Sequence, residues 1–185
     1  MSDNLKPLSV IAVIALIILA PAIRDALREE AATYVDDSES SHDGLPESWN
    51  DTQVFCVLFP DQTSHPKFTS GVTMIEQDGS TLGTNSEYNG TGACAGGFSG
   101  FENGLDLMDA AVNSSGTDLV YNSTEFSFGL QIDSIGGIEP CDATECSDSS
   151  GAYWALYHNG GTSLVGISDI ILSEGDVLLW QIATW

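Results

Sequence analysis

The chain has 185 residues and 42% of them are apolar, which is enough for one domain with a buried core. It carries 27 acidic and only 4 basic residues, for a formal net charge of -23, and Lys67 is the only lysine or arginine after Arg28. This charge excludes a nucleic-acid partner, because phosphate binding requires lysine and arginine. It leaves a solvated acidic surface or a cation-binding one. The carboxylates lack the spacing of a calcium loop, so no metal site is predicted.

The N-terminal segment predicts where the protein is located. Leu8–Ile23 is uncharged and apolar, and the helical pattern continues beyond it among Arg, Asp and Glu residues. Residues 1–35 are therefore predicted to be a membrane anchor with an amphipathic stalk, the rest of the chain lying outside the cell. Ala20-Pro21-Ala22 also fits a signal-peptide cleavage site, so secretion after cleavage at Ala22 stays open.

A third interpretation is a structural subunit of a pilin-like filament or membrane assembly, a homo-oligomer built on the N-terminal helix. Lys6-Pro7 before the apolar run, and the lack of a carboxylate inside it, disfavour this reading. Residues 36–50 are acidic and serine-rich and predict a linker, which leaves residues 51–185 for the folded domain.

Cysteines and glycosylation motifs support an extracellular location. The chain has four cysteines, none in a C-x-x-C pair, and we prefer the disulfides Cys56–Cys94 and Cys141–Cys146 among the three possible connectivities. Asn-x-Ser/Thr acceptor motifs occur at Asn50, Asn89, Asn113 and Asn122.

The first part of the domain alternates strand and turn signals. Thr52–Phe59 and Gly71–Gln77 are rich in β-branched and apolar residues and predict two strands. The segment 91–104 (TGACAGGFSGFENG) predicts a glycine-rich loop without the lysine of a phosphate cradle. The segment 104–115 (GLDLMDAAVNSS) has the period of a short amphipathic helix.

The last part of the domain predicts further strands. They are expected in the segments 126–137 (FSFGLQIDSIGG), 152–161 (AYWALYHNGG, running into a turn) and 177–185 (VLLWQIATW). The order predicts an α+β domain in which one helix packs on a mixed sheet.

The segment from Tyr153 to Asn159 is the candidate binding site. Strand alternation places Trp154, Leu156 and His158 on one face and Tyr153 and Tyr157 on the other. We expect the Trp154 face to be core, which leaves the two tyrosines half exposed as a platform for a ring, a sugar or a partner chain. Rings that only stabilise strand pairing are the alternative reading. Tyr153, Tyr157, His158 and Asn159 are the candidate ligand-binding residues.

No catalytic residues are predicted. The three histidines are His42, His65 and His158, and no serine or cysteine lies in a nucleophile motif. Pairs of carboxylates are abundant, but in a chain this acidic they do not identify a general acid.

Four segments in order resemble the transcobalamin C-terminal-like domain family. They are Gly104–Ala111, Ile132–Gly137, Tyr153–Gly160 and Gly166–Trp180. The resemblance implies a β-grasp fold and, in the animal carriers, a cap over bound cobalamin; many microbial members are surface modules. It makes cobalamin a possible ligand, with His158 as a potential cobalt ligand. The carriers also have a large helical domain, for which this chain has no room, so tight cobalamin binding by this domain alone is not expected.

Together these features predict a non-catalytic, membrane-anchored or secreted β-grasp module that binds a corrinoid, a sugar or a partner protein outside the cell.

Overall fold

The computed structural model describes residues 41–61, 64–86, 90–127 and 129–185. The predicted anchor Leu8–Ile23, the Ala22 cleavage site, the stalk and residues 36–40 of the predicted linker lie outside these ranges. Within the described ranges, no helix combines the length and the apolar character needed to cross a bilayer.

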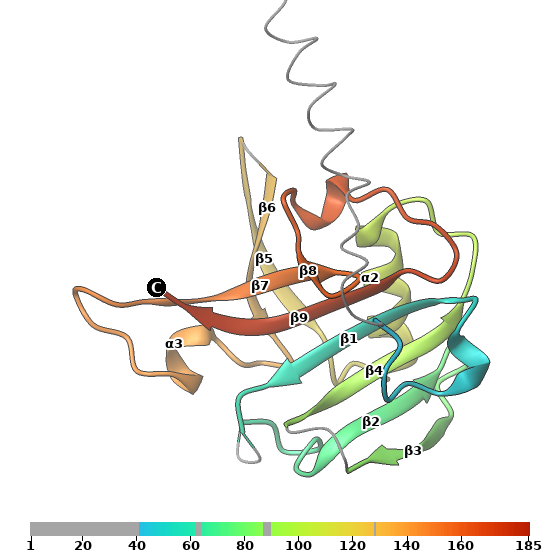
Figure 1. Ribbon diagram of the computed structural model, residues 1–185. Coiled ribbons are helices and arrows are strands. Elements are labelled where there is room, and N and C mark those ends of the chain that lie inside the picture. Colours follow the sequence, from blue (N-terminus) through green and yellow to red (C-terminus); the bar gives the residue numbers. More distant parts are fainter. Residues whose placement is uncertain (1–40, 62–63, 87–89, 128) are drawn as a thin grey trace, which may run out of the picture.

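A seven-stranded mixed sheet is the main element, in the order β3-β2-β4-β1-β9-β7-β8 (Figure 1). The neighbours pair antiparallel except for β2 with β4 and β1 with β9, which run parallel. Its strands are β1 (Gln53–Phe59), β2 (Gly71–Glu76), β3 (Thr81–Asn85), β4 (Thr91–Phe98), β7 (Ala152–His158), β8 (Gly161–Thr162) and β9 (Val177–Thr184).

The remaining elements surround this sheet. They are the helices α2 (Gly104–Ser114) and α3 (Pro140–Ala143), the 3-10 turns η1 (Glu47–Trp49) and η2 (Ile167–Asp169), and the two-stranded sheet of β5 (Tyr121–Phe126) and β6 (Gly129–Ile135). Figure 1 shows α2 behind the large sheet and the β5–β6 hairpin projecting away from it. The fold is α+β, as predicted from the order of elements.

Helix α2 forms where its sequence predicts it. Asn103 caps the helix, since its side chain accepts a hydrogen bond of 2.9 Å from the Asp106 backbone N–H. The helix buries Leu107, Met108 and Ala111 against the sheet, while Leu105 is only partly buried.

Two apolar clusters lie on the two faces of the sheet. The larger one joins α2 and β6 to Phe55, Val57, Trp154 and Trp180. The smaller one contains Trp49 and the buried Cys56–Cys94 disulfide, whose cysteines face each other across β1 and β4. Because β1 is covered on both faces, its sequence is a nearly continuous apolar run.

The structure of the segment 91–104 differs from the loop predicted from its sequence. Residues Thr91–Phe98 are not a loop but the buried central strand β4. Small residues are required there, because a Cβ on Gly96 would lie 2.3 Å from the ring of Trp49. The glycines therefore indicate close packing rather than a loop.

The segment 126–137 also differs from its prediction. Its strand, β6, begins at Gly129, because Phe126 belongs to β5 and pairs with Gly129 where the hairpin closes. The edge strand β3 and most of β5 are exposed and lack apolar alternation, so nothing in their sequence predicted them.

Tyr121 connects β5 to α2, because its hydroxyl donates a 2.8 Å hydrogen bond to Asp109. Partial burial and that carboxylate raise the pKa of Tyr121 to about 12, so the hydroxyl stays a donor at neutral pH.

Candidate functional site: an aromatic cavity at one end of β7

Strand β7 ends in the turn that its sequence predicts. His158 pairs with Gly161, which leaves Asn159 and Gly160 as a two-residue turn between β7 and β8. Both turn residues have positive φ, 50° for Asn159 and 84° for Gly160, the backbone of the tight hairpin turn that Asn-Gly favours.

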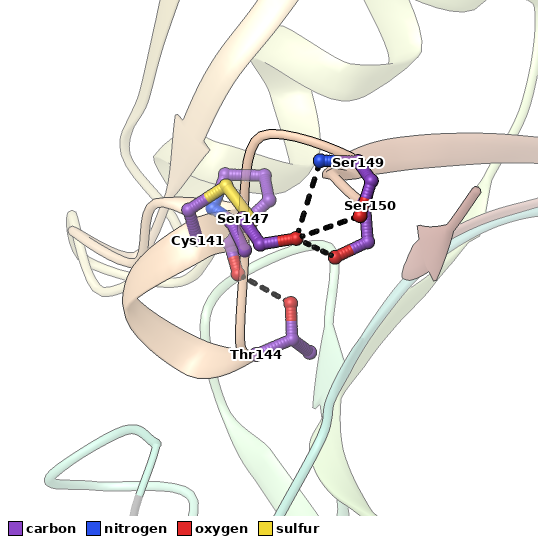
Figure 2. The surroundings of a disulfide bond; sticks show 7 residues. Cys141, Thr144, Ser147, Ser149 and Ser150 are labelled. Atoms are coloured by element: carbon purple, nitrogen blue, oxygen red, sulfur yellow. Dashed lines mark hydrogen bonds between the residues drawn. A yellow bond between two sulfur atoms is a disulfide. The ribbon is translucent and has the colours of Figure 1, made fainter.

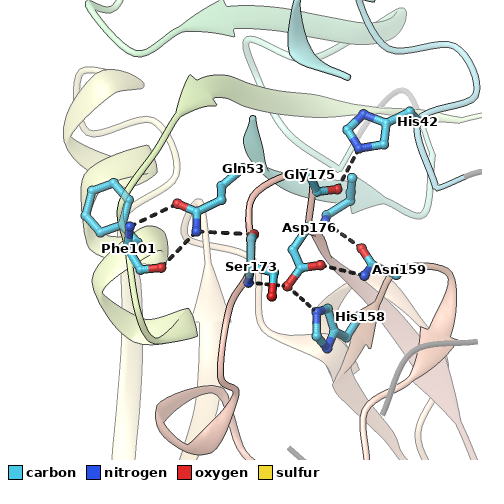
Figure 3. Close-up of polar contacts among 9 residues, drawn as sticks. His42, Gln53, Phe101, His158, Asn159, Ser173, Gly175 and Asp176 are labelled. Atoms are coloured by element: carbon cyan, nitrogen blue, oxygen red, sulfur yellow. Dashed lines mark hydrogen bonds and ion pairs between the residues drawn. The ribbon is translucent and has the colours of Figure 1, made fainter. Parts of the chain in front are cut away.

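The side chains of His158 and Asn159 enter a buried polar network centred on Asp176 (Figure 3). His158 Nε2 lies 3.0 Å from Asp176 Oδ2, and Asn159 Nδ2 donates to Asp176 Oδ1 over 2.8 Å. Asn159 Oδ1 accepts a 2.7 Å hydrogen bond from the Val177 N–H, and the Ser173 N–H donates to Asp176 Oδ2. We call His158, Asn159 and Asp176 the polar network.

The charge of Asp176 is stabilised by these donors. Burial of Asp176 acts to raise its pKa, but the adjacent His158 ring and the hydrogen bonds from Asn159 and the Ser173 N–H outweigh burial and hold the pKa below its usual value. His158 is only 4% exposed and its Nε2 faces Asp176, so the ring is engaged within the fold rather than presented to a ligand.

Other segments close over this end of the sheet. His42 Nε2 lies 2.7 Å from the Gly175 carbonyl oxygen. Gln53 bridges two loops, since its amide donates to the Phe101 and Ser173 carbonyl oxygens and accepts from the Phe101 N–H (Figure 3). Together with the polar network, these contacts join five parts of the chain, around residues 42, 53, 101, 158–159 and 173–176.

The predicted facing of β7 is confirmed. Trp154, Leu156 and His158 are buried, whereas Tyr153 is 47% exposed and Tyr157 is partly exposed. Tyr153 lies beside Trp185, with ring centroids 5.8 Å apart, a neighbour that the sequence did not predict.

An open cavity of about 610 Å³ lies at the Tyr153 end of the strand. Its walls come from β6, the start of α3, the start of β7, Trp180 of β9 and the residue after β9. We call it the aromatic cavity, after its ring-bearing residues Tyr153, Trp154, Trp180 and Trp185.

Sheet register explains why these rings meet. Trp154 is opposite Ile182 and Leu156 is opposite Trp180, so the two buried tryptophans lie on the same face of neighbouring strands. Strand β8 pairs only with Tyr157 and His158, which leaves the first part of β7 without a strand partner on that side among the described residues.

Trp185 is held at the cavity by a close approach to the backbone. Its N–H donates to the Gly151 carbonyl oxygen over 3.1 Å. A Cβ on Gly151 would lie 2.1 Å from the Trp185 ring, so the ring occupies the space that a side chain at position 151 would take. Glycine at this position therefore lets the fourth ring lie against the start of β7.

A disulfide loop supports another wall. Cys141 pairs with Cys146, the connectivity preferred from the sequence, and Cys141 itself lines the cavity. Figure 2 shows this loop, in which Ser147 Oγ lies 2.9 Å from Ser150 Oγ and Thr144 Oγ1 donates to the Pro140 carbonyl oxygen. The cross-link fixes the short helix α3 beside β7, which it contacts.

Two features of the cavity point to a ligand. Trp154 Nε1 donates to the Ile138 carbonyl oxygen over 3.2 Å, but the equally buried Trp180 Nε1 has no hydrogen-bond partner among the described residues. A buried hydrogen-bond donor without an acceptor costs folding free energy, so an acceptor from a bound molecule would be favourable here. Asp133 and Glu139 add two carboxylates to the lining.

Sequence reasoning found only Tyr153 among the residues of this cavity. The alternation of β7 predicts Trp154 as a core residue, and no sequence pattern places Asp133, Glu139, Trp180 or Trp185 at a cavity. The available signal was that three of the four tryptophans lie in the last third of the chain. Among the described residues, no group of three or more His, Cys, Asp or Glu side chains is arranged to hold a metal ion.

The glycosylation motifs have the following positions. Asn50, Asn113 and Asn122 are exposed, and Asn122 Nδ2 donates to Ser134 Oγ over 2.9 Å. Asn89 lies outside the described residues.

Comparison with known proteins gives a family match and several structural likenesses, among them the following two. Residues 105–184 match the family described as Domain of unknown function (DUF4430), a span that includes most of the region resembling transcobalamin C-terminal-like domains. A protein from Ruminococcus gnavus ATCC 29149, to which metal binding is ascribed, aligns at 15% identity and a TM-score of 0.34, over 60% of this chain and 92% of that one. Haptocorrin in complex with Cbi aligns at 18% identity and a TM-score of 0.36, over 60% of this chain and 25% of haptocorrin. No curated protein matches the chain.

Proposed function

We propose that the domain is a non-catalytic binding module that holds a small molecule in the aromatic cavity. The observation that carries this proposal is the cavity itself: four aromatic residues line one open space, and one of them, Trp180, has a buried indole N–H without a hydrogen-bond partner among the described residues. Its volume of about 610 Å³ is that of ordinary small-molecule sites, which are apolar spaces with a few polar groups.

The absence of catalysis in this proposal is supported by how the reactive side chains are used. All four cysteines are in disulfides. His65 and His158 are buried, and His65 Nδ1 accepts hydrogen bonds from the Lys67 and Phe68 N–H groups. Each is engaged in the fold, whereas a general base must reach its substrate.

In this proposal the domain is a β-grasp module similar to the transcobalamin C-terminal-like domains, and it lies outside the cell. The four sequence segments named above, and the helix packed on a mixed sheet, support the first part. The two disulfides, the three exposed acceptor asparagines and the apolar segment Leu8–Ile23 support a membrane-anchored or secreted domain. A corrinoid, a sugar and a partner protein are the ligand classes expected from the sequence.

The proposal is tested with the full chain in a polyoxyethylene detergent. A chemically mixed panel of neutral, cationic and anionic small molecules, including cobalamin and neutral oligosaccharides, is screened by ligand-observed NMR. The comparison protein is Ala152→Phe, which fills the cavity from a residue of its lining at the start of β7. An exposed site elsewhere, Thr84→Phe on β3, is the matched control.

The expected result is a set of compounds that bind the wild-type chain and Thr84→Phe but not Ala152→Phe. If every compound that binds does so equally well to Ala152→Phe, or if none binds, the cavity is not a ligand site and the proposal fails.

A further inference from the structure

The rings of the aromatic cavity are suited to a positive charge. Trp154 and Trp180 are each 5% exposed and form the buried part, while Tyr153 and Trp185, 47% and 71% exposed, form the outer part. Aromatic faces attract ammonium groups, most strongly where water is excluded, and tryptophan is the best of them. Rings alone would also accept a neutral apolar group, so the charges around them decide between the two.

The charges around the cavity are all negative. Asp133 and Glu139 belong to its lining. Asp133 is oriented by hydrogen bonds from Thr124 Oγ1, at 2.7 Å, and Gln131 Nε2, at 3.3 Å. Glu139 is exposed, and its carboxylate has no partner among the residues that the structure describes.

Nothing on the domain offsets this negative potential near the cavity. Lys67 is the only lysine or arginine between residues 41 and 185, and it is paired with Asp118. A surface of one sign concentrates ligands of the other sign and repels anions. A neutral apolar ligand would gain nothing from it.

The unpartnered indole adds a second requirement. Trp180 Nε1 is a donor, so it needs an acceptor and cannot bind the ammonium group itself. A neutral oxygen, in a hydroxyl or carbonyl, would satisfy it without bringing a negative charge near Asp133 and Glu139. The ligand should therefore carry a cationic nitrogen and a neutral oxygen.

We propose that the aromatic cavity binds an organic cation, a quaternary or protonated amine with a hydroxyl or carbonyl oxygen. This inference rests on the proposed small-molecule function and names its ligand class. The rings take the ammonium group, Asp133 and Glu139 supply the negative potential, and Trp180 Nε1 donates to the oxygen.

The test compares choline with its neutral isostere, in which carbon replaces the quaternary nitrogen. The full chain in polyoxyethylene detergent carries isotope-labelled tryptophan, and the four indole N–H resonances are followed during each titration. Trp49 lies in the apolar cluster on the other face of the sheet and is the internal reference. Choline is expected to shift Trp154, Trp180 and Trp185 but not Trp49, and the isostere to bind about tenfold more weakly.

Charge variants test the role of the carboxylates. Glu139→Gln is expected to weaken choline binding by about two- to fivefold, the size of a partly exposed ion-pair effect, with no change for the isostere. Glu47→Gln removes an exposed carboxylate from η1 and should leave both affinities unchanged, which separates a local effect from a change in net charge.

The outcomes distinguish this inference from the proposed function. If the isostere binds as tightly as choline, or if panel compounds bind in the cavity but choline does not, the cation preference is wrong and the binding function stands. If neither choline nor any panel compound depends on the cavity, both proposals fail.

Discussion

The two ends of strand β7 carry aromatic and polar side chains and use them in opposite ways. At the Asn159 end, His158, Asn159 and Asp176 are buried; Asn159 donates a hydrogen bond to Asp176, and His158 Nε2 lies 3.0 Å from the Asp176 carboxylate without forming a well-aligned hydrogen bond. At the Tyr153 end, rings surround an open space and the Trp180 indole N–H has no partner among the described residues.

This difference separates a structural cluster from the proposed binding site. The Asp176 carboxylate accepts hydrogen bonds from Asn159 and the Ser173 N–H and faces the buried His158 ring, so its interactions are made within the fold. A cavity with apolar walls and an incomplete donor gains from being filled. Polar residues in a promising motif, such as His158 and Asn159, are thus poor evidence of a site until their partners are known.

The largest expected effect is loss of the polar network. Asp176→Asn puts an amide where two side-chain donors and the Ser173 N–H need an acceptor, and we expect the free energy of unfolding to fall by about 3 kcal/mol. Chemical denaturation measures the change. Asp148→Asn, at an exposed carboxylate in the disulfide loop region, is the control and should change stability little. A similarly small change for Asp176→Asn would show that the network is not structural.

The next effect concerns the wall of the aromatic cavity. Replacing Cys141 and Cys146 with serine removes a cross-link over a sequence separation of 5, for which loop-closure entropy predicts a stability loss of about 2 kcal/mol. Because Cys141 lines the cavity, affinity for the panel compounds should fall as well. The indole of Trp49, on the other face of the sheet, should keep its resonance position. Unchanged affinity in this double variant would mean that α3 has no part in the site.

A smaller effect is expected from two matched substitutions of buried tryptophans. Trp154→Phe leaves the Ile138 carbonyl oxygen without its indole donor, whereas Trp180→Phe removes an indole N–H that has no partner among the described residues. Trp154→Phe should therefore be the more destabilising of the two by about 1 kcal/mol. Thermal or chemical denaturation of both variants measures this difference in the free energy of unfolding. Equal losses of stability would indicate that the Trp180 N–H has a hydrogen-bond partner in solution.

The smallest expected effect is a pH dependence that belongs to the polar network. Asp176 has a folded-state pKa below its unfolded value, so its contribution to stability is complete above the unfolded pKa of about 4 and is lost as the pH falls through the folded pKa. Denaturation curves between neutral pH and pH values below about 4 should show this loss. The loss should be shallower in Asp176→Asn, and identical slopes in the two proteins would contradict the assignment.

Periodicity and turn chemistry predicted a good part of the fold. The apolar runs of β1, β2 and β9, the helix α2 and the Asn159-Gly160 turn follow from local sequence. Strand β4 did not, because its glycines are required by the ring of Trp49, which is distant in sequence. The exposed strands β3 and β5 were not predictable, because their sequences lack alternation of apolar and polar residues.

The candidate site was predictable only in part. The alternation of β7 correctly placed Tyr153 at the surface, but the rings that meet it come from β9 and the residue beyond it. Which of Trp154 and Trp180 has a hydrogen-bond partner depends on the Ile138 carbonyl oxygen, which no sequence pattern locates. Likewise, only the register of β7 and β9 brings His158 to Asp176.

The most direct test of the account is one NMR sample that reports on both ends of β7. The full chain is labelled at tryptophan and histidine and titrated with the compounds that bind in the panel screen. The account predicts that the Trp180 indole resonance shifts with saturation while the His158 imidazole resonances stay in place. A shift of His158 with Trp180 unmoved would place the ligand at the polar end and contradict the account.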